Sequence, residues 1–95
     1  MKGHCLTLIN STHVLLLGGD TEEQSDSKNV YIYDFLGKKW AKRASMNFGR
    51  SNFGCPKFTN LGNNGAMTVV AVGGDTKMVE FYDVETDQWS SGLYQ

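Results

Sequence analysis

One pattern of residues occurs twice in this chain, about fifty positions apart. Residues 14 to 21 read VLLLGGDT, and residues 69 to 76 read VVAVGGDT. A Tyr-Asp pair follows in each copy, at Tyr33 and Asp34 and again at Tyr82 and Asp83, and a tryptophan lies six residues after each aspartate. Self-similarity at such a period indicates one supersecondary unit that is used twice.

The spacing between the two copies is not constant. The glycine pairs are 55 residues apart, whereas the Tyr-Asp pairs and the tryptophans are 49 residues apart. The first copy therefore has extra residues between Asp20 and Asn29, and the second has extra residues near positions 61 to 65. Because loops tolerate length changes better than paired strands do, these insertions are predicted to be loops.

Each copy is predicted to form four short strands. The first strands lie near residues 5 to 9 and 55 to 59, and the second strands end at the glycine pairs and are apolar on both faces, which is typical of strands covered from both sides. The third strands are residues 30 to 34 and 79 to 83, and a fourth begins near each tryptophan. No segment has a sustained helical period, so an all-β fold is predicted.

The charge balance excludes some classes of partner. Nine Lys and Arg residues against ten Asp and Glu residues give a net charge of −1, which is too balanced for a nucleic-acid-binding surface. The basic residues around Trp40 form one cluster, which is interpreted as a solvated edge, with a localisation or RNA-binding patch as the alternative. No apolar run is long enough to span a membrane, so neither nucleic acid nor membrane is an expected partner.

The chain has two cysteines, Cys5 and Cys55. Two cysteines cannot build the disulfide framework of a small secreted scaffold, so a reducing compartment and a cytoplasmic (intracellular) location are predicted. Cys5 and His4 are not expected to form a catalytic dyad, because neighbours on a strand point to opposite faces.

The second strand ending in two glycines, the third ending in Tyr-Asp and the tryptophan six residues later resemble the Kelch repeat of β-propellers. The resemblance covers the whole chain and includes the link MNFGR at residues 46 to 50, which is similar to the Met and Arg between Kelch repeats. It implies two four-stranded antiparallel blades of an incomplete propeller, at residues 1 to 46 and 47 to 95. Further blades, from a longer chain or from other copies, are then expected to cover the flanks.

The resemblance also implies a set of structural residues. The glycines are expected where the backbone turns sharply and approaches a neighbour, the tryptophans where they fill the wedge between blades, and the tyrosines where a buried ring keeps a partner for its hydroxyl. The implied residues are Gly18, Gly19, Tyr33, Asp34 and Trp40 in the first copy, and Gly73, Gly74, Tyr82, Asp83 and Trp89 in the second.

In Kelch propellers that bind partners, the loops after the second strands and the links between blades line one face. The resemblance therefore implies contact segments at residues 20 to 29, 46 to 53 and 75 to 77. The first is acidic and would suit a basic partner, although an ordinary solvated loop is the alternative. Arg50 could clamp an acidic peptide or hold the inter-blade link through backbone carbonyls. The candidate contact residues are Asp20, Glu22, Glu23, Asp26, Arg50, Ser51, Asn52, Asp75 and Lys77.

The sequence shows no nucleophile elbow, paired-carboxylate site, zinc spacing or dinucleotide fingerprint. It therefore predicts no catalytic residue, metal or cofactor, and not an enzyme. The resemblance implies a protein-interaction module, either the substrate-recognition part of a BTB-Kelch cullin ubiquitin-ligase adaptor or an actin-associated scaffold. The corresponding partner is a ubiquitin-ligase substrate or actin. The alternative is part of a propeller enzyme resembling galactose oxidase or sialic-acid epimerase.

Overall fold

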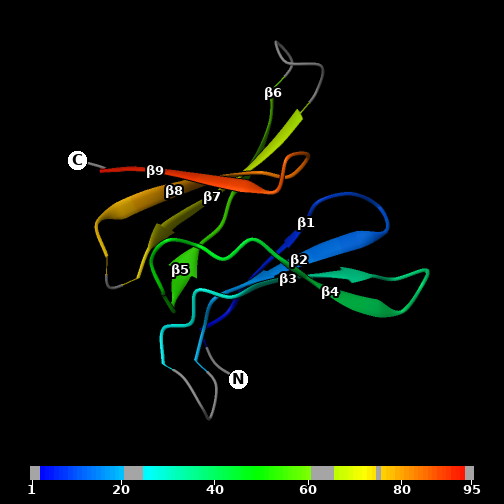
Figure 1. The fold of residues 1–95 in the computed structure, drawn as a ribbon, viewed down its shortest axis with the longest axis horizontal. Coiled ribbons are helices and arrows are strands. Elements are labelled where there is room, and N and C mark those ends of the chain that lie inside the picture. The colour runs from blue at the N-terminus through cyan, green and yellow to red at the C-terminus, as the bar shows by residue number, and fades with distance from the viewer. Residues whose placement is uncertain (1–2, 21–24, 61–65, 75, 94–95) are drawn as a thin grey trace.

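The computed structural model shows two antiparallel β-sheets joined by a short link (Figure 1). It describes residues 3 to 20, 25 to 60, 66 to 74 and 76 to 93. Within these ranges no helix could cross a membrane. The first sheet has the order β1-β2-β3-β4, and in the second β7 pairs with β5, β6 and β8, and β8 pairs with β9. The strands are β1 (Cys5–Leu8), β2 (His13–Leu17), β3 (Val30–Asp34), β4 (Lys39–Arg43), β5 (Phe53–Gly54), β6 (Lys57–Asn60), β7 (Ala66–Gly73), β8 (Met78–Asp83) and β9 (Gln88–Leu93).

This architecture confirms the all-β prediction and differs from it in one strand. The first strand of the second copy is interrupted, because β5 pairs with one end of β7 and β6 with the other. Pro56 lies at the break, and proline has no N–H to donate to a neighbouring strand. The Pro56 carbonyl still accepts a hydrogen bond from the Val70 N–H at 2.8 Å. The β1 strand of the first copy has no such interruption.

The two glycine pairs occupy equivalent places at the ends of β2 and β7. Gly18 and Gly19 have φ values of 59° and 89°, and Gly73 and Gly74 have values of 98° and 78°, a region that favours glycine. The link after β4 runs against both pairs. A Cβ on Gly18 would lie 2.5 Å from the Arg50 carbonyl oxygen, and one on Gly74 would lie 3.0 Å from the Ser51 carbonyl oxygen.

The hydrophobic core lies between the two sheets. Alternation along β2 and β3 directs Leu15, Leu17 and Val30 toward the second sheet, which contributes residues from β7 and β8 to the same cluster. Burial of such side chains stabilises the fold by about 1.5 to 3 kcal/mol each. The cluster consists of Ile9, Leu15, Leu17, Val30, Met46, Cys55, Val69, Ala71 and Tyr82.

A disulfide between Cys5 and Cys55 joins the sheets, with the two Cα atoms 6.1 Å apart. Cys5 opens β1 opposite Leu17, on the side of the first sheet that faces the core, and Cys55 lies in the interruption between β5 and β6. The sequence analysis did not predict this bond. The two cysteines become partners because they lie on the sides of the two sheets that face each other across the core.

Candidate protein-interaction surface and the contact between sheets

Tyr82 and Trp89 lie on the side of the second sheet that packs against the first. They are directly opposite each other on β8 and β9, and their ring centroids are 4.8 Å apart. Tyr82 is fully buried, and the Trp89 indole N–H donates a hydrogen bond of 2.8 Å to the carbonyl of Ala44, just after β4. The aromatic pair therefore receives the end of the first sheet.

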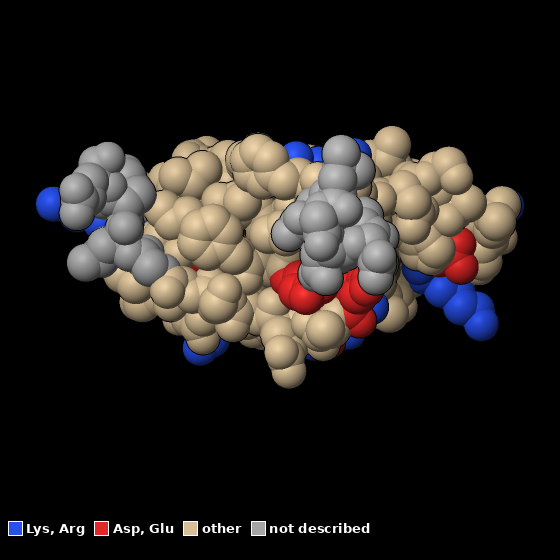
Figure 2. Space-filling view, turned by 90° about the horizontal axis from the view of Figure 1, so that it is seen from above, with Lys and Arg blue, Asp and Glu red and all other residues tan. Residues whose placement is uncertain are grey.

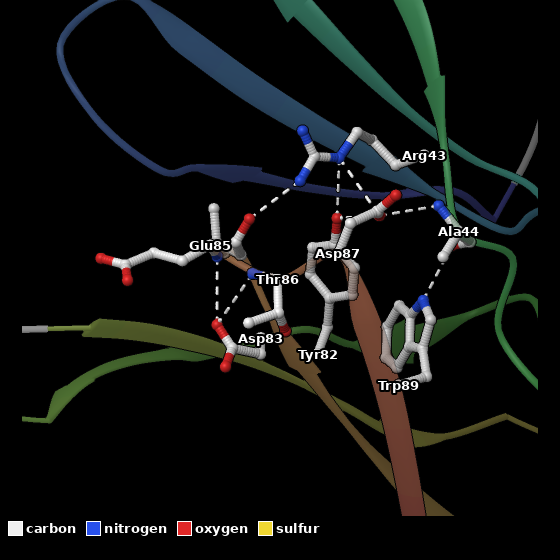
Figure 3. A network of polar contacts seen from close by, with 9 residues as sticks. Arg43, Ala44, Tyr82, Asp83, Glu85, Thr86, Asp87 and Trp89 are labelled. Carbon is white, nitrogen blue, oxygen red and sulfur yellow. Dashed lines mark hydrogen bonds and ion pairs between the residues drawn. The ribbon is translucent and has the colours of Figure 1, made fainter. Parts of the chain in front are cut away.

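Polar groups surround this aromatic pair (Figure 3). Arg43 donates through Nε to the Tyr82 hydroxyl at 2.8 Å and to Asp87 Oδ1 at 3.2 Å, and through Nη2 to the Val84 carbonyl at 2.8 Å. Asp87 Oδ1 also accepts the Tyr82 hydroxyl at 2.5 Å and the Ala44 N–H at 2.8 Å. We call Arg43, Ala44, Tyr82, Asp87 and Trp89 the inter-sheet polar cluster.

The cluster changes the acidity of its members. Burial, together with the hydrogen bond to Asp87, raises the pKa of Tyr82 to about 12. Burial opposes ionisation of Asp87, but hydrogen bonds from Tyr82 and Ala44 and the charge of Arg43 hold its pKa below the usual value. Burial also disfavours the charge on Arg43, yet its contacts with Tyr82 and Asp87 raise its pKa. At neutral pH the cluster therefore joins an arginine cation, an aspartate anion and a neutral tyrosine.

A second, buried ion pair fixes the link between the sheets. Arg50 Nη2 lies 2.9 Å from Glu80 Oε2, and both side chains are fully buried. Arg50 also donates to the carbonyls of Gly73 and Met78, while Glu80 accepts the N–H groups of residues 47 and 48. Buried charges need such partners, because desolvation is otherwise costly. Of the two roles considered for Arg50, the structure shows that of holding the link.

Two predicted contact segments lie against each other although they are distant in sequence. The Ser51 hydroxyl donates to Asp26 Oδ1 at 2.7 Å, and the Arg50 N–H donates to the Ser27 carbonyl at 3.2 Å. Asp20 Oδ1 accepts the Asp26 N–H at 2.8 Å within the loop. We call residues 20, 25 to 29 and 47 to 52 the loop surface.

The candidate contact residues differ in their accessibility. Arg50 and Ser51 are buried, so their side chains do not offer a surface contact, which corrects the prediction for these two residues. Asn52 and Lys77 are exposed, and Asp20 and Asp26 are half-buried. Glu22, Glu23 and Asp75 lie outside the residues that the structure describes. A partner can therefore reach the loop surface through Asp20, Asp26 and Asn52.

The aspartates of the two Tyr-Asp pairs stabilise turns, a role that the sequence analysis did not assign. Asp34 Oδ1 accepts the N–H of Leu36 at 3.0 Å, and Asp83 Oδ1 accepts that of Glu85 at 3.0 Å. Both are side-chain caps on the turn that follows the third strand of each copy. The position of an aspartate as the last residue of each of these strands was the available signal.

The outer face of the first sheet is uncovered and apolar. The register of β1 to β4 places Leu8, Tyr33 and Trp40 in one row. Leu6, Leu8 and Trp40 are 62%, 48% and 56% exposed. No described segment packs on that side, so the expectation that Trp40 fills a wedge between blades stays a prediction. We call Leu6, Leu8, Tyr33, Lys38 and Trp40 the outer Tyr-Trp face.

A cavity of about 330 Å³ lies on the second sheet. Among the described residues that line it, Asp83 is the charged one, and its carboxylate also caps the β8–β9 turn. The view from above in Figure 2 likewise shows a mostly uncharged surface with acidic and basic side chains in small separate groups. The residues lining the cavity include Thr68, Phe81, Asp83, Gln88, Trp89 and Ser90.

Comparison with known proteins places these features in a family. Two F-box/kelch-repeat proteins of Arabidopsis thaliana are 36% and 30% identical to the chain over 93 and 98 residues, and the alignments cover 92% and 90% of the chain but 22% of each relative. Kelch-like protein 25 of Xenopus tropicalis is 31% identical over 84 residues, which are 81% of the chain and 14% of that protein. No family model matches the chain.

Two face-to-face antiparallel sheets with equivalent glycine pairs and Tyr-Trp pairs define the chain as repeated blades of the β-propeller class. The curated relatives make the assignment specific. The chain belongs to the Kelch-repeat family, and it spans about a fifth of the length of the two Arabidopsis relatives.

Proposed function

We propose that the chain is a protein-interaction module and that its loop surface contacts the partner. The observation that carries this proposal is the pairing of Ser51 with Asp26, which joins the loop after β2 to the link after β4. Binding residues are often placed on loops that a rigid scaffold positions, and here the buried pair of Arg50 and Glu80 supplies the rigidity. The carboxylates of Asp20 and Asp26, with Glu22 and Glu23 in the same loop sequence, favour a basic partner.

Within this function we propose the substrate-recognition part of a ubiquitin-ligase adaptor, acting in the cytoplasm. The names of two relatives join an F-box to kelch repeats, and this favours the adaptor over an actin-associated scaffold. Co-sedimentation of the full-length protein with filamentous actin, in the absence of co-purifying ubiquitin-ligase subunits, would reverse this order.

Charge reversal tests the loop surface. We expect Glu22→Lys combined with Glu23→Lys to remove basic proteins from those that co-purify with the full-length protein, because the loop then repels them. Glu85→Lys reverses an exposed acid in the β8–β9 turn and serves as the control, which should keep the same partners. Equal retention by both variants, with unchanged circular dichroism, would exclude the loop as the contact.

A further inference from the structure

β4 is the last strand of the first sheet, and one of its two edges pairs with no described strand (Figure 1). Along its other edge it pairs with β3 over all five of its residues. An edge strand presents a row of N–H and C=O groups with which a further extended segment can pair. The first sheet already has the four strands predicted for a blade, so such a segment would be a fifth strand added to a complete sheet.

Lysine side chains flank this open edge. Lys39 and Lys42 are exposed in β4, and Lys38 is exposed in the turn before it. Within the described part of the chain, none of the three forms an ion pair or a side-chain hydrogen bond. The acid opposite Lys39 in β3 is Asp34, and its Oδ1 accepts the Leu36 N–H. The edge therefore carries positive charge with which no described acid is paired.

The equivalent strand of the second copy shows that the fold does not require these lysines. The register places Gln88 of β9 where β4 has Lys39. It likewise places Ser91 where β4 has Lys42, and both β9 residues are exposed. Lysines often protect sheet edges from unwanted pairing, but β9 is the last strand of the second described sheet without having them. The positive charge is thus specific to the β4 edge, which favours a role in binding.

We propose that the open edge of β4 binds an extended acidic segment of another protein as an added antiparallel strand. Backbone hydrogen bonds hold the segment to the edge, and its acidic side chains pair with Lys39 and Lys42. Because these lysines are three positions apart, the acids in the segment are also three positions apart. A β-branched or aromatic residue of the segment lies opposite the exposed Trp40. This site shares no residue with the loop surface, for which a basic partner is proposed.

Positive charge alone would also attract a nucleic acid. The net charge of the chain is −1, however, which gives no broad basic surface for a phosphate backbone. The open edge offers backbone donors and acceptors at the spacing of another strand. A peptide segment is therefore the occupant that uses both the charge and the edge.

A synthetic peptide tests the site. The probe is a short fluorescent peptide of threonine and valine with two glutamates three positions apart, and anisotropy measures its binding to the 95-residue chain. Lys39→Glu combined with Lys42→Glu should weaken binding at least about tenfold, because two attractive pairs become repulsive. Lys28→Glu combined with Lys77→Glu makes the same change of net charge at other exposed positions and should keep the affinity within about twofold. A peptide with lysines in place of the glutamates should bind the first double variant and not the unmodified chain.

Methylation of the peptide backbone separates strand addition from simple charge attraction. Two versions of the glutamate peptide are made, each methylated at every second nitrogen, so that only one version blocks the edge that faces β4. One version should lose binding, and the other should keep it.

The proposal fails if the glutamate peptide does not bind, if the two methylated versions bind equally, or if the two double variants bind the peptide equally. Tighter binding of a single-stranded RNA at the same lysines would assign the edge to nucleic acid and would also overturn the proposal. Matched circular dichroism of the chain and both double variants establishes that all three are folded.

Discussion

The two Tyr-Trp faces contain the same aromatic residues in the same register, but one is covered and the other is open. Tyr82 and Trp89 lie against the end of the first sheet, whereas Tyr33 and Trp40 face outward and Trp40 is 56% exposed. The comparison shows that the same aromatic pair can be buried or exposed in one chain. Whether it stabilises the fold depends on what is packed against it.

The largest expected difference between the faces comes from removing each tryptophan. Trp89→Ala should lower the free energy of unfolding by about 3 to 5 kcal/mol, since it opens a cavity between the sheets and frees the Ala44 carbonyl. Trp40→Ala removes an exposed ring and should cost less than about 1 kcal/mol. Urea unfolding followed by circular dichroism measures both. Equal losses of unfolding free energy at the two positions would contradict the difference between the covered and the open face.

A disulfide also joins the two sheets at the covered face. Reducing it separates the contribution of the disulfide to the free energy of unfolding from the contribution of the packed side chains. The disulfide joins residues 50 positions apart, and removing a cross-link over such a loop should lower the free energy of unfolding by about 4 kcal/mol. Urea unfolding with and without reductant measures this, and Cys5→Ser should match the reduced protein.

Unchanged unfolding on reduction would mean that the noncovalent contact alone determines the stability of the covered face. Because cytosolic thiols are kept reduced, the result also bears on the predicted cytoplasmic location. A reduced protein that remains folded is compatible with that location, and one that unfolds is not.

A smaller effect follows from the acidity of Tyr82. Its pKa is raised from 10.0 to about 12 in the folded state, so the unfolded chain loses this proton first. The contribution to stability is complete below pH 10 and is lost as the pH rises from 10 to 12, by about 2 to 3 kcal/mol. Tyr82→Phe should remove this part of the pH dependence in urea unfolding. The same slope in both proteins would assign it to other groups.

Local signals predicted much of the fold. Glycine pairs after apolar runs and aromatic residues at fixed spacing determine strands and turns over a few residues, which is why the all-β fold and the repeat were predictable. The interruption at Pro56 was also available from the sequence, because proline inside a predicted strand argues against continuous pairing.

Long-range contacts were not predictable in the same way. The partner of Arg50 is Glu80, and the two residues are 30 positions apart in the sequence. A glutamate on the same face of β8 as Tyr82 indicates that a buried charge needs a partner, but it does not say which residue that partner is. The bond between Cys5 and Cys55 and the exposure of Trp40 likewise depend on which sheets pack together, information that the spacing of residues does not contain.

The buried carboxylate of Glu80 has a consequence for how this protein can be divided. It holds the N–H groups of Asn47 and Phe48 as well as the guanidinium of Arg50, so removing those residues would leave an anion in the interior with nothing to neutralise it. The smallest unit that keeps these contacts is therefore a sheet together with the link that precedes it. When such units are exchanged between proteins of this kind, the chain should be cut before that link.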